Sequence, residues 1–175
     1  MNTAELHLII GPMFSGKTTE LLRIARRLDS IGLKVLLINY AEDTRYSTTE
    51  LSSHDKVKLP CKFSNDLLEV DYSDFDVVCI NEAQFFTELK TFCKYVLADY
   101  KKLYVSGLDG DFKQDTFGEI VNLIPLANSI VKLNAYCKMC KNGTLAPFTR
   151  RLTECKDIKM IGTEEYIAVC RSHLN

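Results

Sequence analysis

The stretch that decides the fold is Gly11-Pro-Met-Phe-Ser-Gly16-Lys17-Thr18, which matches the pattern GxxxxGK[ST]. It follows an apolar run and precedes a helical pattern carried by Leu21, Ala25 and Leu28. The glycines let backbone amides turn inward around phosphate oxygens, and the helix N-terminus adds its positive dipole end. We expect this P-loop to bind a nucleoside triphosphate through Gly11, Pro12, Met13, Phe14, Ser15, Gly16, Lys17 and Thr18. The alternative is a glycine turn that joins a strand to a helix and exposes a lysine.

Within the P-loop, two side chains have a defined chemical task. Lys17 should reach the β and γ phosphates, and the hydroxyl of Thr18 should bind magnesium.

Alternating strand and helix patterns predict an α/β protein with a mainly parallel sheet flanked by helices. The helix after the P-loop and a second one over 89–100 separate short apolar runs, which we predict as strands at 5–10, 34–40, 76–80, 102–106 and 131–136. The polar stretch 41–53 reads as a flexible loop, and the chain from 137 onward as a small lobe. We therefore predict a nucleotide-binding domain over 1–136 and a second domain over 137–175.

Composition narrows the classes of partner. The 175 residues carry a net charge of -1 and no run of five or more like charges, so neither nucleic acid nor a membrane surface is an expected partner. Arg23, Arg26 and Arg27 share one helix face, which we interpret as solvated rather than as a nucleic-acid patch. No apolar stretch reaches the length of a membrane span and the start lacks a signal peptide, so we expect a cytoplasmic protein.

The C-terminal lobe contains a pattern of metal ligands. Cys137-x-x-Cys140 and Cys170-x-x-His173 provide the ligands of a closed, tetrahedral, structural zinc site. The alternative is that these thiols and the imidazole pack passively. We interpret Cys79 and Cys93 as core residues, and His7 as a packed or edge residue of its strand.

The run 76–80 ends in Asn81-Glu82-Ala83-Gln84-Phe85-Phe86, which places acidic and aromatic groups at a second strand end. A carboxylate such as that of Glu82 can accept a proton from an attacking hydroxyl. The alternative is a helix cap supplied by Asn81.

Seven ordered blocks carry a resemblance to a known family: GPMFSGKTTELL, NYAEDTRY, INEAQFF, GLDGDF, CKMC, FTRRL and EYIAVCR. Across almost the whole chain they resemble the type II thymidine kinases, the cellular and poxvirus-like enzymes. The resemblance implies a RecA-like P-loop fold with a small zinc-binding lasso lobe. It also implies transfer of the ATP γ-phosphate to the 5′-hydroxyl of thymidine, giving dTMP, by a homotetramer that dTTP inhibits by feedback.

The resemblance also implies roles for individual residues. Glu82 matches the general base, acting with Lys17 and magnesium. The matching substrate-binding residues are Phe85 and Phe117 in the nucleoside pocket, Tyr166 of the lasso loop, Met13, Leu108 and Thr149 around the thymine methyl group, Arg45, Phe112 and Val169. Without the resemblance, core packing would explain the aromatic residues and a surface position would explain Arg45.

The sequence departs from the family pattern at three places. Asn81 stands where the family usually has an aspartate that organises magnesium, and a neutral amide is a poorer partner for this cation. His173 replaces a cysteine ligand, and the lasso block IGTEEY before Tyr166 is shorter than usual.

Two other classes of protein share some of these features. A RecA-like P-loop ATPase would use Glu82 to activate water, and a zinc-ribbon module would use the cysteines to contact nucleic acid or protein. The slight negative charge and the aromatic residues at the strand ends favour a nucleoside as substrate.

Overall fold

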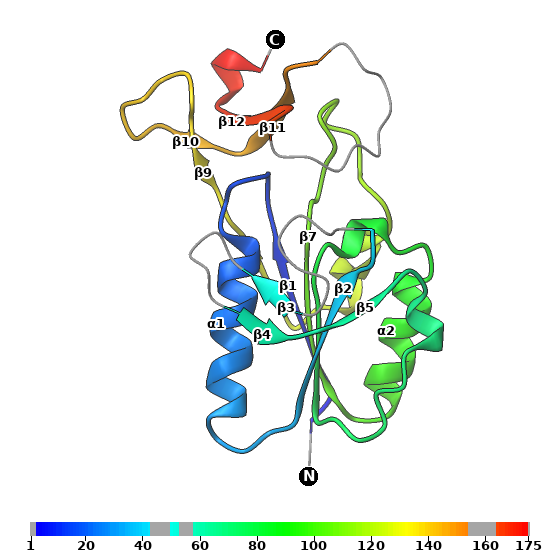
Figure 1. Ribbon diagram of the computed structural model, residues 1–175. Coiled ribbons are helices and arrows are strands. Elements are labelled where there is room, and N and C mark those ends of the chain that lie inside the picture. The colour runs from blue at the N-terminus through cyan, green and yellow to red at the C-terminus, as the bar shows by residue number, and fades with distance from the viewer. Residues whose placement is uncertain (1–2, 43–49, 53–57, 154–163, 175) are drawn as a thin grey trace.

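The apolar runs form a six-stranded sheet in which every strand pair is parallel. The structure is a computed structural model that describes residues 3–42, 50–52, 58–153 and 164–174. The strand order is β5-β2-β6-β7-β1-β8. The strands are β1 (Glu5–Ile10), β2 (Val35–Tyr40), β5 (Lys62–Ser64), β6 (Val77–Ile80), β7 (Lys102–Gly107) and β8 (Ser129–Lys132). The carboxyl ends of the parallel strands therefore meet at one edge, at the top of Figure 1.

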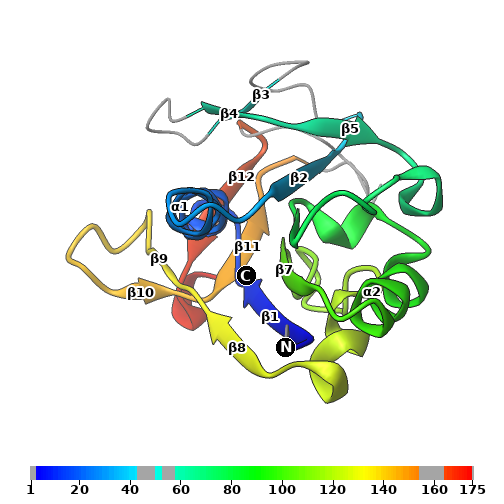
Figure 2. The ribbon, with the colours of Figure 1, turned by 90° about the horizontal axis from the view of Figure 1, so that it is seen from below.

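Two α-helices cover opposite faces of the sheet, α1 (Lys17–Asp29) and α2 (Leu89–Ala98), as Figure 2 shows. Alternation along β1 divides its side chains between the faces, because Leu6, Leu8 and Ile10 join the core beneath α2 while Ile9 joins the core beneath α1. Full burial of an apolar side chain of this size stabilises a fold by about 1.5–3 kcal/mol. Short 3-10 helices connect the strands: η1 (Leu67–Glu69), η2 (Ala83–Phe85) and η3 (Ile120–Leu126).

A small lobe stands beyond the carboxyl edge of the sheet (Figure 1). It consists of two antiparallel strand pairs and a 3-10 helix, namely β9 (Ala135–Tyr136) with β10 (Leu145–Ala146), β11 (Phe148–Arg151) with β12 (Tyr166–Val169), and η4 (Arg171–His173). Its core is small and consists mainly of alanines, one valine and cysteines. So little apolar burial gives limited stability, and an additional cross-link is expected in such a unit.

The strand predicted over 131–136 is wrong in its bounds. β8 ends at Lys132 after pairing with β1, and the chain then turns so that β9 pairs with β10 in the small lobe. The apolar run in the sequence therefore spans parts of two different sheets.

The stretch 41–53, predicted as a loop, contains a strand. β3 (Glu50–Ser52) pairs antiparallel with β4 (Lys58–Pro60), which the polar composition did not indicate. Residues 43–49 and 53–57 of this region lie outside the described residues.

No helix in the described parts of the chain combines the length and the apolar character needed to cross a membrane.

Candidate phosphate and nucleoside site

The P-loop lies between β1 and α1 at the carboxyl edge of the sheet, where the sequence places it. Its backbone needs residues that tolerate positive φ, with values of 144° at Gly11, 63° at Phe14 and 84° at Gly16. Gly11 also passes close to a neighbouring backbone, since a Cβ there would lie 2.4 Å from the carbonyl oxygen of Leu133. The turn therefore depends on glycine at position 11 for both conformation and space.

Two P-loop side chains bind the same backbone carbonyl. The Lys17 ammonium donates to the carbonyl oxygen of Pro12 at 2.7 Å, and the Ser15 hydroxyl donates to it at 2.8 Å. The lysine charge therefore lies inside the curve of the loop, where the backbone amides are suited to bind anions.

A chain of polar side chains joins the P-loop helix to two strand ends. The Thr18 hydroxyl donates to Oδ1 of Asn81 at 3.2 Å, and the Asn81 amide nitrogen donates to Oδ1 of Asn39 at 2.9 Å. Asn39 and Asn81 are buried, with only 1% and 2% of their surface exposed. The contact places Glu82, the next residue, beside the start of α1.

Glu82 has a constrained position immediately after β6. Its φ of 51° lies in the left-handed region, which is uncommon for a residue with a side chain. One carboxylate oxygen, Oε2, accepts a hydrogen bond from Nε2 of Gln84 at 2.6 Å. Strained backbone of this kind is concentrated at functional sites.

Aromatic side chains gather beside Glu82. The ring of Phe85 lies 5.2 Å from Tyr40 and 5.5 Å from Phe117, measured between centroids, and the contact with Phe117 is edge-on. All three rings come from segments at or beyond the carboxyl ends of strands. The structure therefore brings together the two phenylalanines predicted for the nucleoside pocket.

A second group of predicted residues surrounds a buried arginine. The guanidinium of Arg151 lies 3.9 Å from the ring centroid of Phe112 and 5.0 Å from that of Tyr166, and it donates a hydrogen bond to the Tyr166 hydroxyl. Cation–π contacts of this geometry hold the loop that carries Phe112 against the β11–β12 hairpin.

The small lobe also contacts the P-loop directly. The backbone N–H of Met13 donates to the Thr149 hydroxyl at 3.0 Å, so these two predicted residues are adjacent. Leu108 follows β7, and its N–H donates to Oε1 of Gln84. Val169 is fully buried in the core of the lobe, and Arg45 lies outside the described residues.

The four predicted metal ligands converge in the small lobe. Cys137, Cys140, Cys170 and His173 place their ligand atoms within 4.8 Å of one another. Nδ1 of His173 lies 3.3 Å from Sγ of Cys170 and 3.4 Å from Sγ of Cys140. A tetrahedral zinc site with Zn–S of about 2.3 Å and Zn–N of about 2.0 Å separates its ligands by roughly 3.5–3.8 Å. The donor set and its spacing therefore fit this metal.

The environment of the cluster favours the thiolate at Cys137 and Cys170 but not at Cys140, where burial and the two neighbouring thiols raise the pKa to about 11. Burial raises the pKa of the Cys137 thiol, but backbone N–H groups of Cys170, Cys140 and Met139 outweigh it and lower that pKa to about 6. The contact with His173 lowers the pKa of Cys170. Because zinc binds the thiolate form, the lowered pKa values of Cys137 and Cys170 reduce the cost of losing protons at these two ligands.

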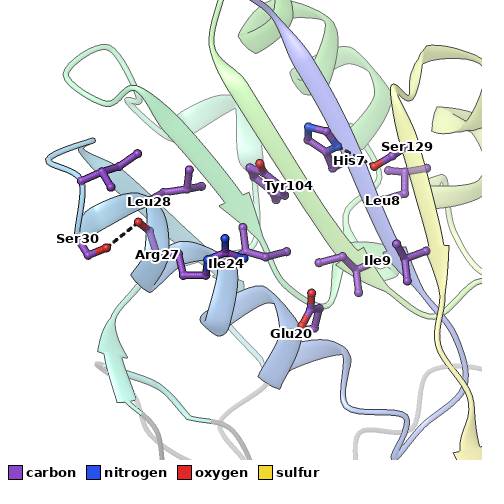
Figure 3. A pocket seen from close by; sticks show the side chains of 12 residues that line it. His7, Leu8, Ile9, Glu20, Ile24, Arg27, Leu28, Ser30, Tyr104 and Ser129 are labelled. Carbon is purple, nitrogen blue, oxygen red and sulfur yellow. Dashed lines mark hydrogen bonds between the residues drawn. The ribbon is translucent and has the colours of Figure 1, made fainter.

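A separate hollow of about 520 Å³ lies along α1, β1 and β8 (Figure 3). Within it His7 stacks on Tyr104 with ring centroids 4.7 Å apart, and Nδ1 of His7 lies 2.7 Å from the Ser129 hydroxyl. Among the described residues, no predicted phosphate, nucleoside or metal ligand lines this hollow. His7 is a packed strand residue here, as the sequence predicted.

Sequence reasoning missed four residues that shape the site: Asn39, Tyr40, Gln84 and Arg151. Asn39 had one signal, a polar residue inside an otherwise apolar strand. Tyr40 ends that strand, a position where ligand contacts are expected. Gln84 and Arg151 stood in quoted blocks, but nothing in their spacing distinguishes them from surface residues.

These features define an α/β protein with a P-loop at the carboxyl edge of its parallel sheet. A solved structure of similar fold is the flagellar accessory protein FlaH from Methanocaldococcus jannaschii, with a TM-score of 0.50 and 13% identity over 87% of this chain and 74% of that one. This likeness concerns the fold alone.

Sequence comparison then identifies the family. The thymidine kinase family model matches residues 4–174, and the chain belongs to this family. It is 42% identical to the thymidine kinase of Raccoon poxvirus, covering 98% of this chain and 97% of that one. It is 40% identical to the cytosolic thymidine kinase of Gallus gallus, over 96% of this chain and 75% of that protein. It is 42% identical to the thymidine kinase of Oryza sativa subsp. japonica, over 97% of this chain and 65% of that protein.

The close approach at Gly11 in the P-loop predicts a larger cost for its substitution than for that of Gly32, which follows α1. Gly32→Ala forces alanine to a φ of 88° in open space, so we expect a loss of about 1–2 kcal/mol in the free energy of unfolding. Gly11→Ala adds a collision with the backbone of Leu133, and overpacking of this kind costs about 1–3 kcal/mol more. Urea denaturation of both variants measures the difference. Equal losses would contradict the close approach at Gly11.

Proposed function

We propose that this chain is an ATP-dependent thymidine kinase that transfers the γ-phosphoryl group of ATP to the 5′-hydroxyl of thymidine, giving dTMP and ADP. Besides family membership, one observation supports it most: the hydrogen bond between Thr18 and Asn81. This contact joins the phosphate-binding helix to the strand end that carries Glu82. A carboxylate beside a phosphate site is the arrangement that transfer to a hydroxyl requires.

The chain's own residues would perform three tasks in this reaction. The P-loop amides and Lys17 would hold the ATP phosphates and stabilise negative charge on the transferred group. Glu82 would accept the proton of the 5′-hydroxyl. The hydroxyl oxygen would bond to the γ-phosphorus as the bond between the γ-phosphorus and ADP breaks. The hydrogen bond of Glu82 with Gln84 supports this role by directing the carboxylate.

The nucleoside would lie between the two aromatic groups. Phe85 and Phe117 would form one wall, and Phe112 and Tyr166 would approach from the loop and the lobe. Met13, Leu108 and Thr149 would surround the thymine methyl group, where an apolar recess rewards one carbon by about 1–3 kcal/mol. We retain Val169 and Arg45 as proposed contacts on the resemblance alone.

The reaction is tested with purified protein, magnesium, γ-labelled ATP and each of the four deoxynucleosides. We expect labelled dTMP in large excess over the other products. Glu82→Gln should lower kcat by about 10²–10⁴-fold, because general base catalysis contributes that much. Glu88→Gln removes a charge from a nearby exposed residue and should leave the rate unchanged. Label released as free phosphate without nucleoside would instead indicate an ATPase.

Magnesium is the metal we propose for the phosphate site. Thr18 Oγ1 and Asn81 Oδ1 are neutral oxygen atoms 3.2 Å apart, and oxygen ligands suit a hard cation. An amide is nevertheless a weaker ligand than a carboxylate. When bound, magnesium would neutralise charge on the β and γ phosphates. Asn81 would support it from a side chain whose orientation Asn39 fixes.

Asn81→Asp should therefore lower the magnesium concentration that gives half-maximal rate, by about tenfold if the residue acts next to the metal. Direct titration of magnesium into the protein with a non-hydrolysable ATP analogue gives a readout independent of turnover. Asn122→Asp makes the same change at an exposed position and serves as the control. An unchanged magnesium dependence in Asn81→Asp would refute the proposed role.

Zinc is the metal we propose for the cluster of Cys137, Cys140, Cys170 and His173. The cluster follows β9 at one end and β12 at the other, so a metal there would join both ends of the segment that carries Thr149 and Tyr166. Bound zinc would supply a structural cross-link to a lobe whose own apolar core is small.

We expect elemental analysis to find one zinc per chain, retained in His173→Cys and lost in His173→Ala. His7→Ala, which removes an imidazole from the hollow along α1, should keep the metal. Because the lobe contacts Met13 through Thr149, zinc loss should also weaken thymidine binding, measured by calorimetry. Full thymidine affinity in zinc-free protein would contradict this coupling.

Feedback inhibition by dTTP is proposed on the family alone. We also propose a cytoplasmic location, from the lack of a signal-peptide pattern, and a division into domains at 136/137, from the change of sequence pattern there. A homotetramer is also proposed, and the exposed edge strand β8 supports it. Ile130 and Val131 on this strand expose 42% and 47% of their surface, which an interface between subunits would cover.

A further inference from the structure

Gln84 is a buried residue of the site, and nothing in the surrounding sequence indicated this. It lies within η2 and only 3% of its surface is exposed. Its side-chain amide makes two hydrogen bonds, donating from Nε2 to Oε2 of Glu82 at 2.6 Å and accepting at Oε1 from the N–H of Leu108 at 3.0 Å. One buried side chain therefore connects the carboxylate after β6 with the backbone after β7.

The chemistry of the partners fixes the orientation of this amide. The Leu108 N–H can only donate, so it requires the amide oxygen, and an ionised Glu82 carboxylate can only accept, so it requires the amide nitrogen. Rotating the amide by half a turn would set its nitrogen against the Leu108 N–H, donor against donor. It would also set its oxygen against the Glu82 carboxylate, acceptor against acceptor. Glutamine meets both requirements, because its amide places an acceptor oxygen and a donor nitrogen side by side at the end of a side chain of this length.

Gly107 and Gly118 pack so closely against Gln84 that a side chain at either position would collide with it. A Cβ at Gly107 would lie 2.6 Å from Oε1 of Gln84, and a Cβ at Gly118 would lie 2.1 Å from its backbone oxygen. Leu108 begins, and Gly118 ends, the loop that carries Phe112 and Phe117. Gln84 is thus held from both ends of that loop, and its position and the position of the loop depend on each other.

We propose that Gln84 is the positioning residue for Glu82, holding the carboxylate in the direction required for proton transfer and tying it to the 108–118 loop. The inference rests on the proposed function, in which Glu82 is the base. Gln84 itself touches neither substrate nor phosphate in this role and acts only through Glu82.

A double-mutant cycle on kcat tests this dependence. Gln84→Met keeps the approximate size and removes both hydrogen bonds, and we expect it to lower kcat by about 10–100-fold, because small displacements of a reacting group have effects of this size. The KM values for thymidine and ATP should change by less than about threefold. In the Glu82→Gln background the same substitution should lower the residual kcat by less than about twofold, because the group it positions is already absent.

Two further variants make the test specific. Gln84→Asn keeps the amide but shortens the side chain by one methylene, so it cannot reach both partners, and it should give the same non-additive loss even where Gln84→Met folds poorly. Gln114→Met changes an exposed glutamine of the same loop and should leave kcat unchanged in both backgrounds.

The experiment distinguishes failure of the positioning role of Gln84 from failure of the proposed base, Glu82. Additive losses, with equal factors in both backgrounds, would overturn the positioning role and leave Glu82 as the base. Full activity in Glu82→Gln alone would overturn the base assignment and this inference with it.

Discussion

The hydrogen-bonded chain Thr18–Asn81–Asn39 is the interaction on which the arrangement of the site depends. It joins the first turn of α1, the end of β6 and the end of β2, three segments that pack together only in the folded protein. Each neutral hydrogen bond contributes about 0.5–1.5 kcal/mol net, whereas a buried partner left unsatisfied costs about 1–3 kcal/mol. Because both asparagines are buried, the pairing strongly disfavours alternative positions of the strand ends, and it sets where Glu82 stands relative to the phosphate loop.

The sequence predicted the features that local chemistry determines. The glycine pattern at 11–18 and the apolar runs at 5–10 and 76–80 predicted their arrangement correctly, because parallel strands bring their carboxyl ends to a common edge. The strand predicted over 131–136 was wrong because its pairing depends on tertiary contacts and not on local chemistry. Nothing in its residues says that Lys132 ends one sheet and Ala135 begins another, since the partners of β8 and β9 are set by tertiary contacts.

The contacts of the site were harder to predict than its members. The CxxC and CxxH spacings, together with the family resemblance, predicted the metal cluster, and the structure brings those ligand atoms together. Arg151 and Gln84 carry no such pattern, because an arginine sandwiched between Phe112 and Tyr166 has the same sequence signature as one in solvent. Their roles come from neighbours that are distant in the chain, and only the folded geometry identifies them.

The strand order has a consequence for the synthesis of this protein. β1 is made first but lies between β7 and β8, so Leu6 meets its partner Leu103 and Leu8 meets Ile130 only after most of the chain exists. At about 5–20 residues per second, a ribosome needs roughly 6–25 s to make that intervening chain. During this interval an apolar strand has no sheet to join and is exposed to aggregation. The late arrival of both partner strands thus makes the release of β1 from this exposed state depend on synthesis reaching β7 and β8.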